Sequence, residues 1–111
     1  MLKINAVKKG SNYSLKMQGH CNFDEEGKDL ICAAASILCL TLAQVIEENE
    51  DKLKSKPKLK TEKGICDIHF IAKPKFNAAL SNSFYTVLTG LRILEYHYPE
   101  CLSIRELRIE N

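Results

Sequence analysis

A chain of 111 residues has the length of one compact domain, and we expect a single domain over residues 1–111. A hydrophobic fraction of 45% and a charged fraction of 27% are ordinary for a soluble globular protein. The formal net charge of only +2 argues against a direct nucleic-acid partner, because nucleic-acid-binding domains tend to be strongly basic.

The N-terminus and the cysteines bear on location and on metal chemistry. Residues 1–7 alternate like a strand and lack the apolar segment of a signal peptide, so we expect a cytoplasmic protein with no membrane partner. Five cysteines without a C-x-x-C pair fit poorly with a disulfide framework or a zinc site. We therefore expect thiols, and neither a metal nor another cofactor. The cysteines are Cys21, Cys32, Cys39, Cys66 and Cys101.

The first half of the chain predicts two strands and a long helix. Leu2 to Lys8 and Tyr13 to Gln18 alternate apolar and polar residues, as half-buried strands do. After a polar loop over residues 19–28, Asp29 is a good N-cap for a helix that runs to about Glu48. This helix is apolar nearly all round, so we expect the sheet on one side and a second helix or a second subunit on the others.

The second half predicts two more strands, a helix and a last strand. Asn77 or Ser81 caps this second helix, and Pro99 stops it. The order ββαββαβ predicts an α+β domain, a mostly antiparallel sheet with both helices packed on one face. The three strands are Leu59–Thr61, Ile65–Ala72 and Leu102–Ile109.

A histidine and a cysteine lie on either side of the polar loop. His20 follows the end of the second strand at Gly19, and Cys32 lies in the first turn of the helix. The positive end of a helix and a nearby imidazolium both lower a thiol pKa from about 8.5 and favour the reactive thiolate. Backbone N–H groups of that turn could hold an oxyanion, while His20 acts as general base and then protonates a leaving amine.

From the residues alone, a structural explanation competes with this one. A cysteine on an apolar helix is usually a packing residue, and a histidine beside a glycine is usually an ordinary loop residue. We expect His69 and His97 to be structural, and Cys39, two helical turns beyond Cys32, to be buried and inert.

The region resembles the signature of the ribosomal-processing cysteine protease (Prp) family. In that signature Gly-His precedes a loop, and a helix opens as Gly-x-Asp-[Ile/Leu]-[Val/Ile]-Cys-Ala-Ala-x-Ser. The resemblance extends over essentially the whole chain in length and order of elements. The matching residues are Gly19, His20, Gly27, Asp29, Leu30, Ile31, Cys32, Ala33, Ala34 and Ser36.

The resemblance implies a cytoplasmic, homodimeric endopeptidase. Its substrate would be the N-terminal extension of bacterial large-subunit ribosomal protein twenty-seven, cut after an aromatic-rich stretch. The family's catalytic histidine and cysteine correspond to His20 and Cys32, and its loop over the substrate corresponds to residues 21–28. The residues that we assign to this substrate loop are Gly19, Cys21, Asn22, Phe23 and Gly27.

Two further positions have roles that the sequence leaves open. The family's aspartate corresponds to Asp29, which either caps the helix or orients the His20 ring. Its serine corresponds to Ser36, which lies one turn after Cys32 and either hydrogen-bonds near the site or bonds back to the Cys32 carbonyl. Cys21, where the family usually has a small residue, places a second thiol beside His20.

Two other functions compete with the protease. A non-enzymatic ribosome-associated module could use the basic stretch Lys52 to Lys63, and it would show salt-dependent affinity for rRNA. A thiol-based metal or redox protein is the third hypothesis, which the missing C-x-x-C disfavours.

Overall fold

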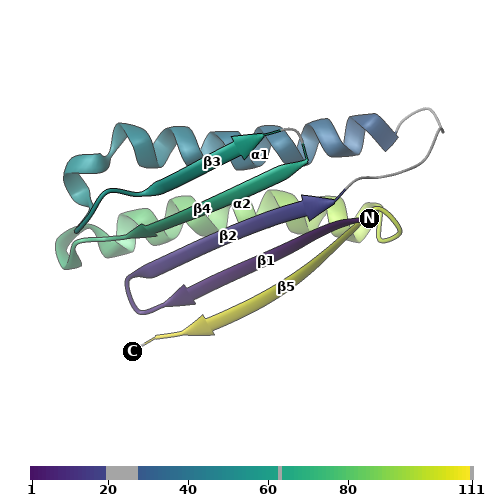
Figure 1. Cartoon of the computed structure of the whole chain (residues 1–111). Coiled ribbons are helices and arrows are strands. Elements are labelled where there is room, and N and C mark those ends of the chain that lie inside the picture. Colours follow the sequence, from purple (N-terminus) through teal and green to yellow (C-terminus); the bar gives the residue numbers. More distant parts are fainter. Residues whose placement is uncertain (20–27, 63, 111) are drawn as a thin grey trace.

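The computed structural model describes residues 1–19, 28–62 and 64–110. Figure 1 shows one five-stranded sheet with two long helices on the same face. This arrangement confirms the predicted α+β class and the order ββαββαβ. The elements are β1 (Leu2–Lys9), β2 (Asn12–Gly19), α1 (Lys28–Glu48), a 3-10 turn η1 (Glu50–Lys52), β3 (Lys58–Glu62), β4 (Ile65–Ile71), a second turn η2 (Pro74–Phe76), α2 (Asn77–His97) and β5 (Leu102–Ile109).

The sheet is antiparallel except at one edge. Its strand order is β3-β4-β2-β1-β5, and only β1 and β5 pair in parallel, from Leu2 opposite Leu102 to Lys9 opposite Ile109. The parallel strand is held to the helix layer by polar contacts. The backbone N–H of Ile104 donates to Glu95 Oε2 at 2.7 Å, and Arg92 forms an ion pair with Glu106.

Alternation along the strands decides which sheet face is covered. In β1, β2 and β4 every second residue is buried under the helices, and the residues between them face away. Tyr13 is the central contact of this core. Its ring stacks on Phe70 with centroids 4.7 Å apart, and its hydroxyl donates to Asn77 Oδ1 at 2.5 Å. One buried side chain of β2 thus joins β4 to the start of α2.

The two helices lie close together because a glycine stands between them. A Cβ on Gly90 of α2 would lie 2.9 Å from a methyl carbon of Leu38 on α1. On its other side α1 is not covered by any described element, and it exposes large apolar side chains. Leu30 is 71% exposed, Ile37 59% and Leu40 45%.

The apolarity of α1 has a further consequence. Its stretch Leu30–Glu48, with a mean hydropathy of 2.0, is long and apolar enough to cross a membrane by length and composition. The expectation of no membrane partner did not anticipate such a stretch. The core helix of a soluble protein passes the same test, and α1 packs its buried residues against the sheet.

Candidate active site

Cys32 lies near the start of α1. The helix begins at Lys28, one residue before the expected cap, so Asp29 lies inside the first turn and Cys32 is the fifth helical residue. The Cys32 side chain is half-buried and packs against the core. The first four N–H groups of a helix have no acceptor within it, and they carry much of its positive terminal charge. Cys32 therefore lies one residue beyond the four whose N–H groups are left without an acceptor in the helix.

The strand that leads to the site ends on a glycine that no other residue can replace without strain. Gly19 closes β2 with φ +111°, in the region that L side chains avoid. A Cβ there would lie 2.3 Å from the carbonyl oxygen of Met1. Glycine is needed at this position both for its positive φ and for the close approach of the N-terminus.

One contact relates this strand end to Cys32. The Cys39 thiol on α1 lies 3.9 Å from Met17 Sδ on β2. From that contact, Gly19 is two residues further along the strand, or about 7 Å. Cys32 is seven residues back along the helix, or about 10 Å. Both displacements lead to the same end of the molecule, where Figure 1 shows β2 ending and α1 beginning.

The deeper thiols are in a different environment. Cys39, Cys66 and Cys101 are 1–2% exposed, and the predicted burial of Cys39 is confirmed. Hydrogen bonding with Cys66, together with burial, raises the pKa of the Cys39 thiol. This thiol therefore stays protonated and inert, although it is on the same helix as Cys32.

The two described histidines are where the sequence placed them. His69 lies exposed in β4, and His97 is the exposed last residue of α2. The His97 ring contacts Tyr96 and Tyr98, with centroids 5.2 and 6.4 Å away.

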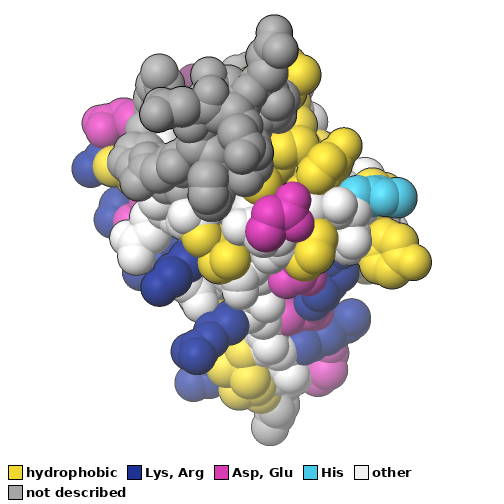
Figure 2. Space-filling model, turned by 90° about the vertical axis from the view of Figure 1, so that its right-hand side faces the viewer, with side chains coloured by type: hydrophobic (Ala, Val, Ile, Leu, Met, Phe, Trp, Pro, Cys, Tyr) yellow, Lys and Arg dark blue, Asp and Glu magenta, His cyan; other side chains and the backbone are white. Residues whose placement is uncertain are grey.

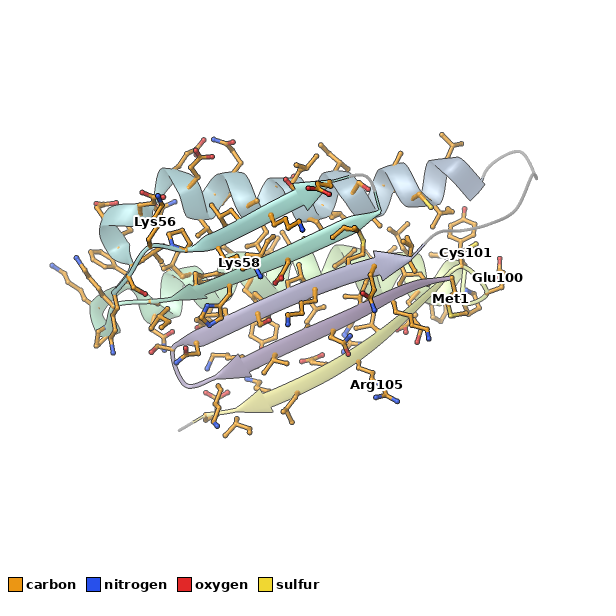
Figure 3. All side chains as sticks on the ribbon, viewed as in Figure 1. Met1, Lys56, Lys58, Glu100, Cys101 and Arg105 are labelled. Atoms are coloured by element: carbon orange, nitrogen blue, oxygen red, sulfur yellow. The ribbon has the colours of Figure 1, made fainter. Side chains whose placement is uncertain are left out.

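The sequence did not show that α2 would end at the same end of the molecule where α1 begins. It does so because the helices run in opposite directions (Figure 1). Figure 2 looks onto this end, where hydrophobic side chains gather next to the region drawn in grey. Figure 3 shows Met1, Glu100 and Cys101 together at the same end, and the Leu2 N–H donates to the Cys101 carbonyl at 2.8 Å.

The described residues include part of the predicted site. Gly19, Cys32 and the half-buried Ser36 are placed, and Asp29 is placed as a helical residue. The other predictions lie outside the described residues. These are His20 as catalytic partner and Cys21, Asn22, Phe23 and Gly27 of the substrate loop.

Comparison with known proteins tests the class of the protein. The cysteine protease Prp family matches residues 1–103 of the chain. No match was found among curated proteins.

Solved structures share the fold over nearly the whole chain. SMU.848 from Streptococcus mutans has a TM-score of 0.72 and 20% identity, covering 97% of this chain and 95% of that one. An essential ribosomal processing protease Prp from S. aureus, solved with a substrate peptide, has a TM-score of 0.71 and 18% identity, covering 96% and 99%. The same protein with a covalently linked product peptide has a TM-score of 0.69 and 19% identity, covering 96% and 99%.

The family match over residues 1–103 places the chain, with its cysteine near the start of α1, in the class of thiol-dependent peptidases. The chain belongs to the cysteine protease Prp family, because the family matches nearly its full length. It is therefore a cysteine protease, and the prediction of an enzyme is confirmed in preference to the non-enzymatic module.

Proposed function

We propose that this protease removes the N-terminal extension of large-subunit ribosomal protein twenty-seven in the cytoplasm, with His20 and Cys32 as its catalytic dyad. The observation that carries the proposal is the position of Cys32, half-buried and five residues into α1. The S. aureus relative is a ribosomal processing protease that binds a substrate peptide.

The proposed reaction begins with the Cys32 thiol giving its proton to His20. The thiolate sulfur attacks the carbonyl carbon of the scissile bond, and backbone N–H groups at the helix start stabilise the oxyanion. The His20 imidazolium then protonates the leaving amine, and a thioester to Cys32 remains. Water, deprotonated by His20, attacks the thioester and releases the carboxylate and the thiol.

Two features support the pairing of His20 with Cys32. His20 is bonded directly to Gly19, whose backbone lies at the end of the molecule where α1 begins. The backbone of Gly19 also lies close to the N-terminus, since a Cβ there would be 2.3 Å from the carbonyl oxygen of Met1.

The test is mass spectrometry of the precursor ribosomal protein incubated with matched variants. We expect Cys32→Ala and His20→Ala each to lower the cleavage rate by about 10³-fold or more. Removing one member of a catalytic dyad costs about as much activity as removing both. The controls Cys39→Ala and His97→Ala remove a thiol and an imidazole outside the proposed dyad, and these variants should cleave at near the wild-type rate. Thermal melts confirm that each variant is folded. Wild-type cleavage by Cys32→Ala would disprove the nucleophile, and retained cleavage by His20→Ala would disprove its partner.

We also propose that the enzyme is a homodimer joined through the outer face of its helices. The apolar side chains Leu30, Ile37 and Leu40 on α1 and Ile93 and Tyr96 on α2 are 45–82% exposed. Large exposed apolar side chains gathered on one surface are typical of a protein interface. The helices that carry these side chains pack against each other, with Leu38 of α1 next to Gly90 of α2.

A further inference from the structure

The face of the sheet that the helices leave open has a clear excess of positive charge. No described element covers this face, and the strand residues that alternate with the core lie on it. Against six cations it has two carboxylates, Glu62 and Asp67. The cations, all exposed, are Lys3, Lys9, Lys16, Lys58, Lys60 and Arg105.

This distribution differs from what the overall charge suggests. The whole chain is only +2 at neutral pH, so the remainder of the sequence is net negative while this face is strongly positive. Net charge predicted no nucleic-acid partner because it averages over the two faces. A local field, not the net charge, steers a polyanion to a surface.

The strand register aligns these charges in a row across the sheet. Lys60 and Lys16 both lie opposite Asp67, while Asn5 lies between Lys16 and Arg105. With strands about 4.8 Å apart, the row from Lys60 to Arg105 is about 19 Å long. Figure 3 shows Lys58 on one edge strand and Arg105 on the other.

The acid in the middle of the row is outnumbered. Lys58 Nζ lies 2.7 Å from Asp67 Oδ2. That hydrogen bond, with the charges of Lys58, Lys16 and Lys60, lowers the pKa of Asp67. One carboxylate can neutralise one lysine, so the row keeps a net positive charge.

The side chains between the cations limit the kind of polyanion. Asn5, Ser14 and Gln18 lie on this face as uncharged hydrogen-bonding groups. No described phenylalanine or tyrosine lies on it, since Tyr13 and Phe70 point into the core. Single-stranded RNA is usually held by stacking its bases on aromatic rings, whereas duplex RNA is held through phosphates and 2′-hydroxyls. The face therefore fits a duplex better than a single strand.

We propose that the open face of the sheet binds the phosphate backbone of double-stranded RNA, without reading its sequence. This surface is separate from the position of Cys32, which lies in the helix layer on the opposite side of the sheet. The protease would thereby be concentrated on RNA-rich particles while its site remains open to peptides. RNA binding is independent of the cleavage chemistry, so each can fail without the other.

The test is fluorescence anisotropy of the full-length protein with two labelled RNA hairpins of unrelated sequence, over a salt series. We expect similar affinities for both hairpins and a log–log salt slope of about −3, as for three to four phosphate contacts. Lys16→Glu with Arg105→Glu should weaken binding at least tenfold. The control, Lys54→Glu with Lys75→Glu, makes the same change in net charge at exposed residues outside the strands, and it should stay within about twofold. Cleavage of a short peptide should be unchanged in both variants.

Several results would overturn the proposal. They are absence of RNA binding at low salt, an equal loss of affinity in the control variant, or a strong preference for one hairpin sequence. Tighter binding to a DNA duplex, an acidic peptide or phosphatidylglycerol vesicles would also overturn it, because the partner would then be of another class.

Discussion

At the scale of single residues, burial separates the thiols that the sequence makes look alike. Cys32 is half-buried near a helix start, and Cys39 is two turns deeper with its sulfur against Met17. The two residues are seven apart and so lie on nearly the same helix face, and the sequence predicted that the one two turns deeper would be buried. It could not predict that Cys66 would share a hydrogen bond with Cys39, since that contact depends on the register between β2 and β4.

We predict that alkylation discriminates among these thiols over a wide pH range. Iodoacetamide attacks the thiolate, so Cys32 should react in the native protein at about pH 8, whereas Cys39 should remain unlabelled even at about pH 9.5. The pKa of Cys39 is raised on folding, so its contribution to stability is complete below about pH 8.5 and decreases above it. Peptide mapping by mass spectrometry measures the labelling, with denatured protein as the fully labelled control. Rapid native labelling of Cys39 would contradict its assignment as an inert core thiol.

At the scale of elements, local sequence patterns predicted most of the helices and strands but little of how the strands pair in the sheet. Alternation placed β1, β2 and β4 to within one or two residues, and Pro99 marked the end of α2 closely. The parallel pairing of β5 with β1 has no local signal, because it depends on contacts such as Glu95 with the Ile104 N–H. With Asp29 as its cap, α1 would have begun at Leu30; it begins two residues earlier, at Lys28, which moves Asp29 from the cap into the first turn.

The catalytic dyad shows the same limit of local sequence patterns. A motif could mark Cys32 because a helix start is a local feature of the chain. The distance from His20 to Cys32 is set by the path of the intervening residues and by the layer packing, which no short motif encodes. That pairing stays a prediction.

The contact between the helices gives a test at this scale. A Cβ at Gly90 would press on the Leu38 side chain, which could move only at the expense of its packing. Gly90→Ala should therefore be close to neutral, since the better helix propensity of alanine, about 1 kcal/mol, offsets a mild clash. Gly90→Leu should destabilise by about 1–3 kcal/mol through overpacking.

Urea denaturation measures both variants. Thr89→Leu, an exposed neighbour in the same helix, is the control and should change the free energy of unfolding by less than about 0.5 kcal/mol. Equal effects of leucine at positions 89 and 90 would show that the helices do not approach each other closely at Gly90.

At the scale of the whole molecule, the two faces divide the surface chemistry. The outer helix face is apolar, with Ile37 on α1 and Ile93 on α2 both more than half exposed, and the open sheet face is basic. A sequence window reports the composition of one helix, and it showed α1 to be unusually apolar. It could not show that α2 would add its own apolar residues beside it, because that depends on how the helices pack.

We predict that charges on the outer helix face dissociate the homodimer. Ile37→Glu with Ile93→Glu places carboxylates where two apolar surfaces would meet. Removing these charges from water would cost more free energy than the apolar contact contributes. Size-exclusion chromatography with light scattering should give a dimer for the wild type and a monomer for this variant. Ile65→Glu with Leu107→Glu makes the same change at exposed apolar positions on the open sheet face, and it should remain dimeric. A monomeric wild type would disprove the dimer. Dissociation of the sheet variant alone would place the interface on the open face and would leave RNA no surface to bind.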